Sequence, residues 1–120
     1  MDIEKTRRYY EDLKEEDFCD CDSCRNFRTQ IKETYPDLAE YLGSMGIDIE
    51  KPYETWSVET GDGKLLYPDT MYLAIGSPDE FVPVKIGDTD IRLTDSYPYT
   101  DMKEEHFVIE VSPILLKDQR

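Results

Sequence analysis

Apolar side chains recur at the spacing of an α-helix over residues 22–35. The positions that share one face are three, four and four residues apart, and they are Cys24, Phe27, Ile31 and Tyr35. This pattern predicts an amphipathic helix with one buried stripe. Asp22 or Ser23 stands where a side-chain oxygen caps the first backbone N–H groups, so the helix is expected to begin there.

Pro36 interrupts that pattern. Proline inside a helix removes a backbone hydrogen bond and clashes with the preceding turn, but it fits the first helical position. A second, short helix is therefore expected to start at Pro36 and to end at Gly43 or Gly46. Its buried stripe consists of Leu38, Tyr41, Leu42 and Met45.

The first 17 residues carry a weaker helical signal. Ile3, Tyr10 and Leu13 form a narrow apolar stripe, which predicts a marginal helix or an arm. Three consecutive acidic residues at 15–17 would sit at the negative end of the helix dipole, so the helix is expected to break there.

After Ile47 the apolar positions alternate, which is typical of β-strands. About six strands are predicted, at residues 55–59, 64–67, 70–75, 82–86, 91–93 and 107–111. Their connections are too short for crossover helices, so they favour an antiparallel meander. Pro83 places its strand at an edge, and Pro113 is expected to end the last one. The fold class is thus α+β in two layers, with residues 18–116 as one domain and the helices on one face of the sheet.

The charge balance narrows the possible partners. The chain of 120 residues carries 28 acidic and 14 basic residues, a formal net charge of −14, and no segment is basic. Nucleic acids and anionic membrane surfaces are bound mainly through Lys and Arg, so both are disfavoured. The acidity indicates either a solubilising surface or a face for a basic protein partner.

The chain lacks the marks of secretion or membrane insertion. Its first residues contain no apolar core of a signal peptide, and no apolar run approaches ~18 residues. Three cysteines within six residues do not resemble a secreted disulfide framework. These features predict a cytoplasmic protein.

The cysteines are the main candidate for chemistry. Cys19, Cys21 and Cys24 have the spacing C-x-C-x2-C, which can bring three sulfur atoms around one tetrahedral Zn²⁺ ion. His106, the single histidine, is the candidate fourth ligand if the last strand begins beside the cluster, although its strand parity points it outward; Asp20 or Asp22 is a local substitute. Two other interpretations stay open, namely small residues packing a helix start, and a reactive thiol.

Aromatic residues offer a further hypothesis. They could line a groove for a peptide or small ligand, or simply pack a thin sheet. The six candidates are Tyr53, Trp56, Tyr67, Tyr72, Tyr97 and Tyr99. Trp56 alternates with polar neighbours together with Val58, so the two are expected to share the buried face of their strand.

Three segments carry a resemblance. The string CDCDSCRNFR at 19–28, the run YPDLAEYLG at 35–43 and the residues EEHF at 104–107 resemble a group of small acidic bacterial hypothetical proteins. The resemblance implies a bacterial origin and no catalytic residue. The expected function is a non-enzymatic interaction or binding module with an acidic surface; the alternative is a small zinc-binding domain. No oligomeric state is predicted.

Overall fold

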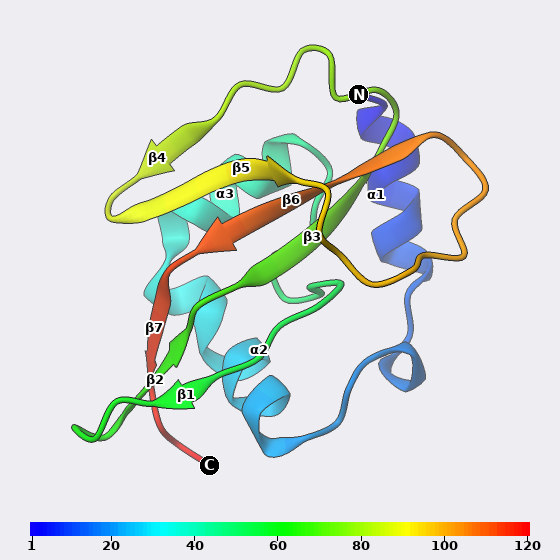
Figure 1. The fold of residues 1–120 in the computed structure, drawn as a ribbon. Helices are drawn as coiled ribbons and strands as arrows, with labels where there is room; N and C mark the ends of the chain where they lie inside the picture. The colour runs from blue at the N-terminus through cyan, green and yellow to red at the C-terminus, as the bar shows by residue number, and fades with distance from the viewer.

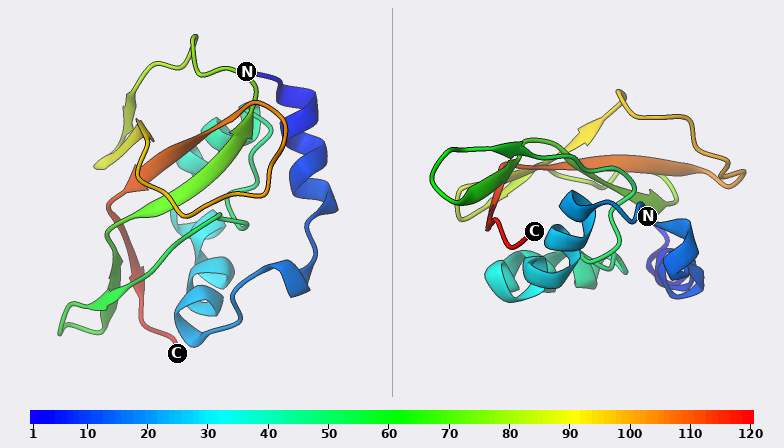
Figure 2. Two further views of the ribbon diagram at one scale, coloured as in Figure 1. Left: turned by 45° about the vertical axis from the view of Figure 1, so that its right-hand side comes forward. Right: turned by 90° about the horizontal axis from the view of Figure 1, so that it is seen from below.

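All helices lie on one side of the β-structure, as the view from below in Figure 2 shows. The computed structural model describes residues 1–120. The helical layer consists of α1 (Ile3–Asp12), the 3-10 turn η1 (Glu15–Asp17), α2 (Asp22–Thr34) and α3 (Pro36–Ser44). The strands are β1 (Val58–Glu59), β2 (Lys64–Tyr67), β3 (Thr70–Ile75), β4 (Val84–Ile86), β5 (Thr89–Thr94), β6 (His106–Ser112) and β7 (Ile114–Lys117). The α+β class and the two layers are confirmed.

The strands form two sheets, and they number seven rather than six. One sheet has the order β1-β2-β7 and the other β3-β6-β5-β4, so β6 inserts between β3 and β5. All paired strands are antiparallel. β4 lies at an edge, as Pro83 predicted. The strand count was too low because the chain resumes pairing as β7 directly after Pro113, instead of ending there.

The two sheets share one long, bent ribbon (Figure 1). β2 pairs with β7 up to Tyr67↔Ile114, and β3 pairs with β6 from Thr70↔Val111. The segment from β2 to β3 and the segment from β6 to β7 therefore bend side by side, at residues 68–69 and 112–113. Each of these two-residue intervals contains a proline, which cannot donate a backbone hydrogen bond to a β-ladder. The bend turns the β1-β2-β7 sheet down along α2.

Helix α2 and helix α3 meet at Pro36, which occupies the start of α3 as predicted. Their buried faces pack against the sheets in a single core. Fully buried members of that core are Phe27, Ile31, Leu38, Leu42, Leu65, Tyr67, Tyr72, Ile91, Ile109, Ile114 and Leu116. The predicted stripe of α2 is therefore largely confirmed, with Tyr35 only half-buried at its end.

The N-terminal segment is a helix that packs against β3. Its inner face consists of Thr6 and Tyr10, which are buried, whereas Ile3 of the predicted stripe is exposed. Tyr10 donates a hydrogen bond from its hydroxyl to the carbonyl of Leu73 at 2.7 Å, and the backbone N–H of Ile75 donates to Thr6 Oγ1 at 3.0 Å. The apolar pattern predicted only a marginal helix here, because two of the buried contacts of α1 are hydrogen bonds of Thr6 and Tyr10.

Candidate metal centre

The three cysteines lie in the segment from Phe18 to Cys24, which we call the cysteine corner, where the chain turns from η1 into α2. The sulfur atoms of Cys19, Cys21 and Cys24 all lie within 4.8 Å of one another. Cys19 and Cys21 are exposed and Cys24 is buried. Three thiolates around one tetrahedral Zn²⁺, with Zn–S bonds of ~2.3 Å, would be ~3.8 Å apart. The three cysteines can therefore hold a metal ion after only small side-chain movements.

Cys21 caps α2, in place of the predicted Asp22 or Ser23. Its sulfur accepts a hydrogen bond from the backbone N–H of Cys24 at 3.5 Å, and its carbonyl accepts one from the N–H of Arg25 at 3.0 Å. A thiolate satisfies a free N–H group at a helix start as a hydroxyl or carboxylate does. The helix start therefore fixes the sulfur of Cys21 next to that of Cys24.

Two arginines hold the loop that carries Cys19. Arg25 forms two hydrogen bonds to the carboxylate of Asp20, at 2.9 and 3.1 Å. Arg28 donates to the carbonyl of Cys19 at 3.0 Å and its guanidinium lies 5.5 Å from the ring centre of Phe18. Both arginines project from the first two turns of α2, so the loop folds back over the helix start and brings Cys19 to the other two sulfurs.

The base of the corner is anchored to both strands of the bent ribbon. The hydroxyl of Tyr67 in β2 donates to the carbonyl of Ser23 at 2.6 Å. Asn26 and Gln30 both donate to the carbonyl of Lys117 in β7, at 2.9 and 2.8 Å. Tyr67, Asn26 and Gln30 are buried, so these bonds fix the position of the helix start on the sheet.

The pKa values of Cys21 and Cys24 are shifted in opposite directions. The backbone N–H of Cys24 stabilises a thiolate on Cys21 and lowers its pKa, although partial burial opposes this. Burial raises the pKa of Cys24, and the neighbouring sulfurs of Cys21 and Cys19 raise it further. Negative charge is therefore favoured at the helix start, on Cys21. A bound cation would favour the thiolate form of each ligand.

The structure does not bring His106 to the cysteines. Its Nε2 lies 2.8 Å from Thr100 Oγ1 and its Nδ1 lies 2.8 Å from the carbonyl oxygen of Glu104. It starts β6 beside the end of β3, where it pairs with Ile75. The cysteine corner lies at the opposite end of the molecule, next to β1 and β2 (Figure 1). Of the local substitutes, Asp20 is bound to Arg25, and neither Asp20 nor Asp22 joins the group of ligand atoms.

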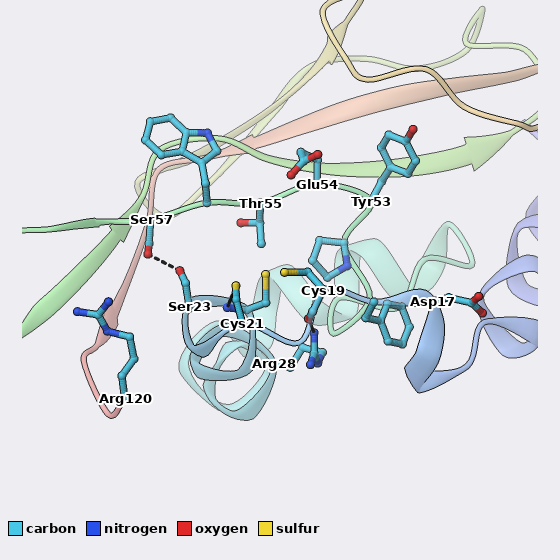
Figure 3. Close-up of a pocket in the computed structure, with 14 residues that line it drawn as sticks. Asp17, Cys19, Cys21, Ser23, Arg28, Tyr53, Glu54, Thr55, Ser57 and Arg120 are labelled. Atoms are coloured by element: carbon cyan, nitrogen blue, oxygen red, sulfur yellow. Dashed lines mark hydrogen bonds between the residues drawn. The ribbon is translucent and has the colours of Figure 1, made fainter.

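The cysteines line a pocket of about 370 Å³. Its opposite wall is the extended segment 52–57, toward which the sulfur atoms of Cys19 and Cys21 point in Figure 3. Ser23 and Ser57 join the two walls by a hydrogen bond between their hydroxyls. Arg28 and Arg120 also line the pocket. Sequence reasoning missed Ser57, Arg28 and Arg120, because no local pattern distinguishes them from other surface residues.

The aromatic candidates do not form one groove. Tyr67 and Tyr72 are buried in the core, whereas Tyr99 is exposed. Tyr53 and Trp56 line the cysteine pocket. The hydroxyl of Tyr53 donates to the carbonyls of Pro98 and Tyr99, at 3.0 and 2.6 Å, and so ties the 95–105 loop to segment 52–57.

The buried placement expected for Trp56 and Val58 is wrong. Their side chains are 51% and 42% exposed. Val58 lies in β1, a strand of only two residues at the edge of its sheet, and Trp56 lies outside that strand. The alternation in this segment therefore does not mark a core-facing strand.

No protein-family model, curated protein or solved structure matches this chain. The resemblance to small acidic bacterial proteins stays a prediction. No helix of the structure is both long enough and apolar enough to cross a membrane.

Proposed function

We propose that the cysteine corner binds one thiophilic metal ion, Zn²⁺, through Cys19, Cys21 and Cys24. The observation that carries the proposal is the convergence of three sulfur atoms within 4.8 Å at the start of a helix. Sulfur-rich tetrahedral sites select Zn²⁺ in preference to hard cations such as Mg²⁺ and Ca²⁺. The function is that of a small metal-binding domain whose ion joins the loop after η1 to α2.

The electrostatics around the corner support a cation with three thiolates. Zn²⁺ and three thiolates together carry one negative charge. The N-terminal end of α2 lies beside that charge, because the backbone N–H of Cys24 donates to the sulfur of Cys21, and a helix N-terminus stabilises negative charge. Arg28 adds a positive charge next to the backbone of Cys19. A site of this kind therefore needs no further positively charged group beside it, even in a chain with a formal net charge of −14.

The test is the metal content of untagged protein and the metal uptake of the apo form. We expect one ion per chain, with Co²⁺ giving the visible absorption of a tetrahedral thiolate site when it replaces Zn²⁺. Cys21→Ser should lower the affinity strongly. Ser44→Ala, at the exposed end of α3, is the matched control and should leave it unchanged. Protein that is purified without metal and takes up neither Zn²⁺ nor Co²⁺ would contradict the proposal.

The surface charge supports a second candidate function, the binding of a basic protein partner. Only seven of the 28 acidic side chains lie within 4.0 Å of a basic group, so most of the negative charge is free to attract a partner. Such attraction acts over a Debye length of ~10 Å at 0.1 M salt and is largely screened at higher salt. Association should therefore slow steeply between about 0.05 and 0.5 M salt; an association rate independent of salt would argue against this function.

A further inference from the structure

The cysteine corner supplies three ligands to a metal ion, whereas Zn²⁺ takes four. No His, Asp or Glu atom joins the three sulfurs. His106 is held by Thr100 and Glu104, and the carboxylate of Asp20 is held by Arg25. If the proposed metal site is correct, its fourth ligand therefore comes from outside the chain.

The sulfurs face a space that has room for such a ligand. All three cysteines line the pocket of about 370 Å³, and segment 52–57 forms its far wall. Small-molecule sites span ~300–1,000 Å³, so the pocket fits a molecule at the small end of that range. Its wall combines the aromatic residues Tyr53 and Trp56 with the hydroxyl of Ser57, which suits a short, partly apolar molecule.

The chemistry of the site selects the donor atom. A Zn²⁺ ion that already has three thiolate ligands is soft, and soft sites prefer a further sulfur to an oxygen donor. A fourth thiolate would change the net charge of the site from −1 to −2. The N-terminal end of α2, where the backbone N–H of Cys24 faces the sulfur of Cys21, offsets part of that charge.

We infer that the fourth position of the metal is open to the pocket and binds a small thiol as its thiolate. The thiol releases its proton to solvent, one metal–sulfur bond forms, and the bond from the metal to a water molecule breaks. No electron is transferred, so the step needs no oxidant. The inference deepens the proposed metal-binding function and rests on it.

The test uses the protein loaded with Co²⁺, because the sulfur-to-cobalt charge-transfer absorption counts thiolate ligands. Titration with 2-mercaptoethanol should raise that absorption by about one-third and to saturation, since four thiolates replace three. Ethylene glycol, the oxygen analogue, should change nothing. Gel filtration after the titration should recover about one cobalt ion per chain.

A variant that fills the pocket separates binding at this position from a general effect of thiol. Ser57→Phe places a ring opposite the sulfurs without removing a ligand, so Co²⁺ binding should persist while the response to 2-mercaptoethanol is lost. Ser44→Phe is the control on the exposed end of α3 and should respond like the unaltered protein.

The possible failures are distinguishable. Absence of cobalt binding in the unaltered protein would overturn the metal site itself. Cobalt binding with no spectral response to thiol would overturn only the open position. Loss of cobalt from the protein on addition of thiol, or an unchanged response in Ser57→Phe, would also overturn it.

Discussion

Two segments attach the N-terminal half to the sheets in different ways. At the α1–β3 junction, where residues 2–10 pack against residues 73–76, Thr6 and Tyr10 are buried and their hydroxyls bond to the chain. In the cysteine corner, Cys19 and Cys21 are exposed, and the ion pair between Asp20 and Arg25 is exposed to solvent, where such pairs contribute little. The two buried hydroxyls of the junction are bonded to other protein atoms, whereas the sulfur atoms of the corner could bind a cation.

A ligand matters at only one of these two segments. Close packing and buried hydrogen bonds stabilise the junction without any partner. The corner keeps its base fixed through Tyr67 and Asn26, while the loop above that base has few buried contacts. Changes at the junction should therefore act on global stability, and changes at the corner should act through metal.

The largest effect is expected at Gly46. It has φ of +83°, and a Cβ there would lie 2.6 Å from the carbonyl oxygen of Ile3 in α1. Gly46→Ala should therefore displace α1 from the loop that follows α3 and lower the free energy of unfolding by about 3–5 kcal/mol. Chemical denaturation measures it.

Gly61 is the matched control for that substitution. It has φ of +86°, but a Cβ there would meet no atom within 4 Å, so Gly61→Ala carries only the backbone strain, ~1–2 kcal/mol. Equal losses for the two variants would show that α1 does not press on Gly46.

Removal of metal should have the next largest effect. At a free Zn²⁺ concentration of about 100 times Kd, binding stabilises the folded state by about 2.7 kcal/mol. A chelator at neutral pH should therefore lower Tm by roughly 10 °C for a chain of this size. Cys21→Ser should start from the lower Tm and ignore the chelator. Superimposable melting curves of the unaltered protein with and without chelator would contradict the corner's dependence on metal.

Tyr10 tests the buried hydrogen bond of the junction. Tyr10→Phe keeps the ring in the core but leaves the carbonyl of Leu73 without its donor, so we expect a loss of about 1–2 kcal/mol. Its neighbour Tyr9 has no hydrogen bond from its hydroxyl and is only half-buried, so Tyr9→Phe should change the free energy of unfolding by less than ~0.5 kcal/mol. A larger loss for Tyr9→Phe than for Tyr10→Phe would contradict the role of the Tyr10 hydroxyl at the junction.

Trp56, on the far wall of the corner's pocket, should matter little for stability. Its side chain is 51% exposed, so Trp56→Ala should cost less than ~1 kcal/mol. Its emission should be red-shifted and quenched freely by acrylamide, a neutral quencher that the negative protein does not repel. A blue-shifted, protected emission would place the indole in the core and remove it from the pocket.

The reactivity of the thiols in the metal-free protein tests the geometry of the cysteine corner, and we expect the smallest change in stability here. The N–H of Cys24 lowers the pKa of Cys21, while burial raises that of Cys24. Iodoacetamide at pH 6–7 should therefore modify Cys21 before Cys24, as peptide mass spectrometry would show. The stability from the thiolate bond is fully present above the ordinary thiol pKa of ~8.5 and is lost as pH falls through the lowered value. Preferential modification of Cys24 would contradict the helix-start geometry.

Local features of the sequence determined much of the fold. Proline geometry at Pro36 separated α2 from α3, and the apolar spacing of Phe27 and Ile31 identified the buried face of α2. Pro83 marked the edge strand. The short intervals between Cys19, Cys21 and Cys24 were enough to bring their sulfurs together. Each of these effects acts within a few residues, so the order of side chains along the chain carries it.

Contacts between distant residues decided the rest. Three of these contacts join segments 34 to 63 residues apart. They are the pairing of β7 with β2 after Pro113, the hydrogen bond from Tyr10 in α1 to β3, and the hydrogen bond from Ser57 to Ser23 beside the cysteine pocket. Trp56 and Tyr67 are both aromatic residues in predicted strands, yet only Tyr67 is buried. His106 likewise lies at the end of β6 far from the cysteines. Burial and proximity of this kind depend on which elements pack together, and that packing is a property of the whole chain rather than of any one segment.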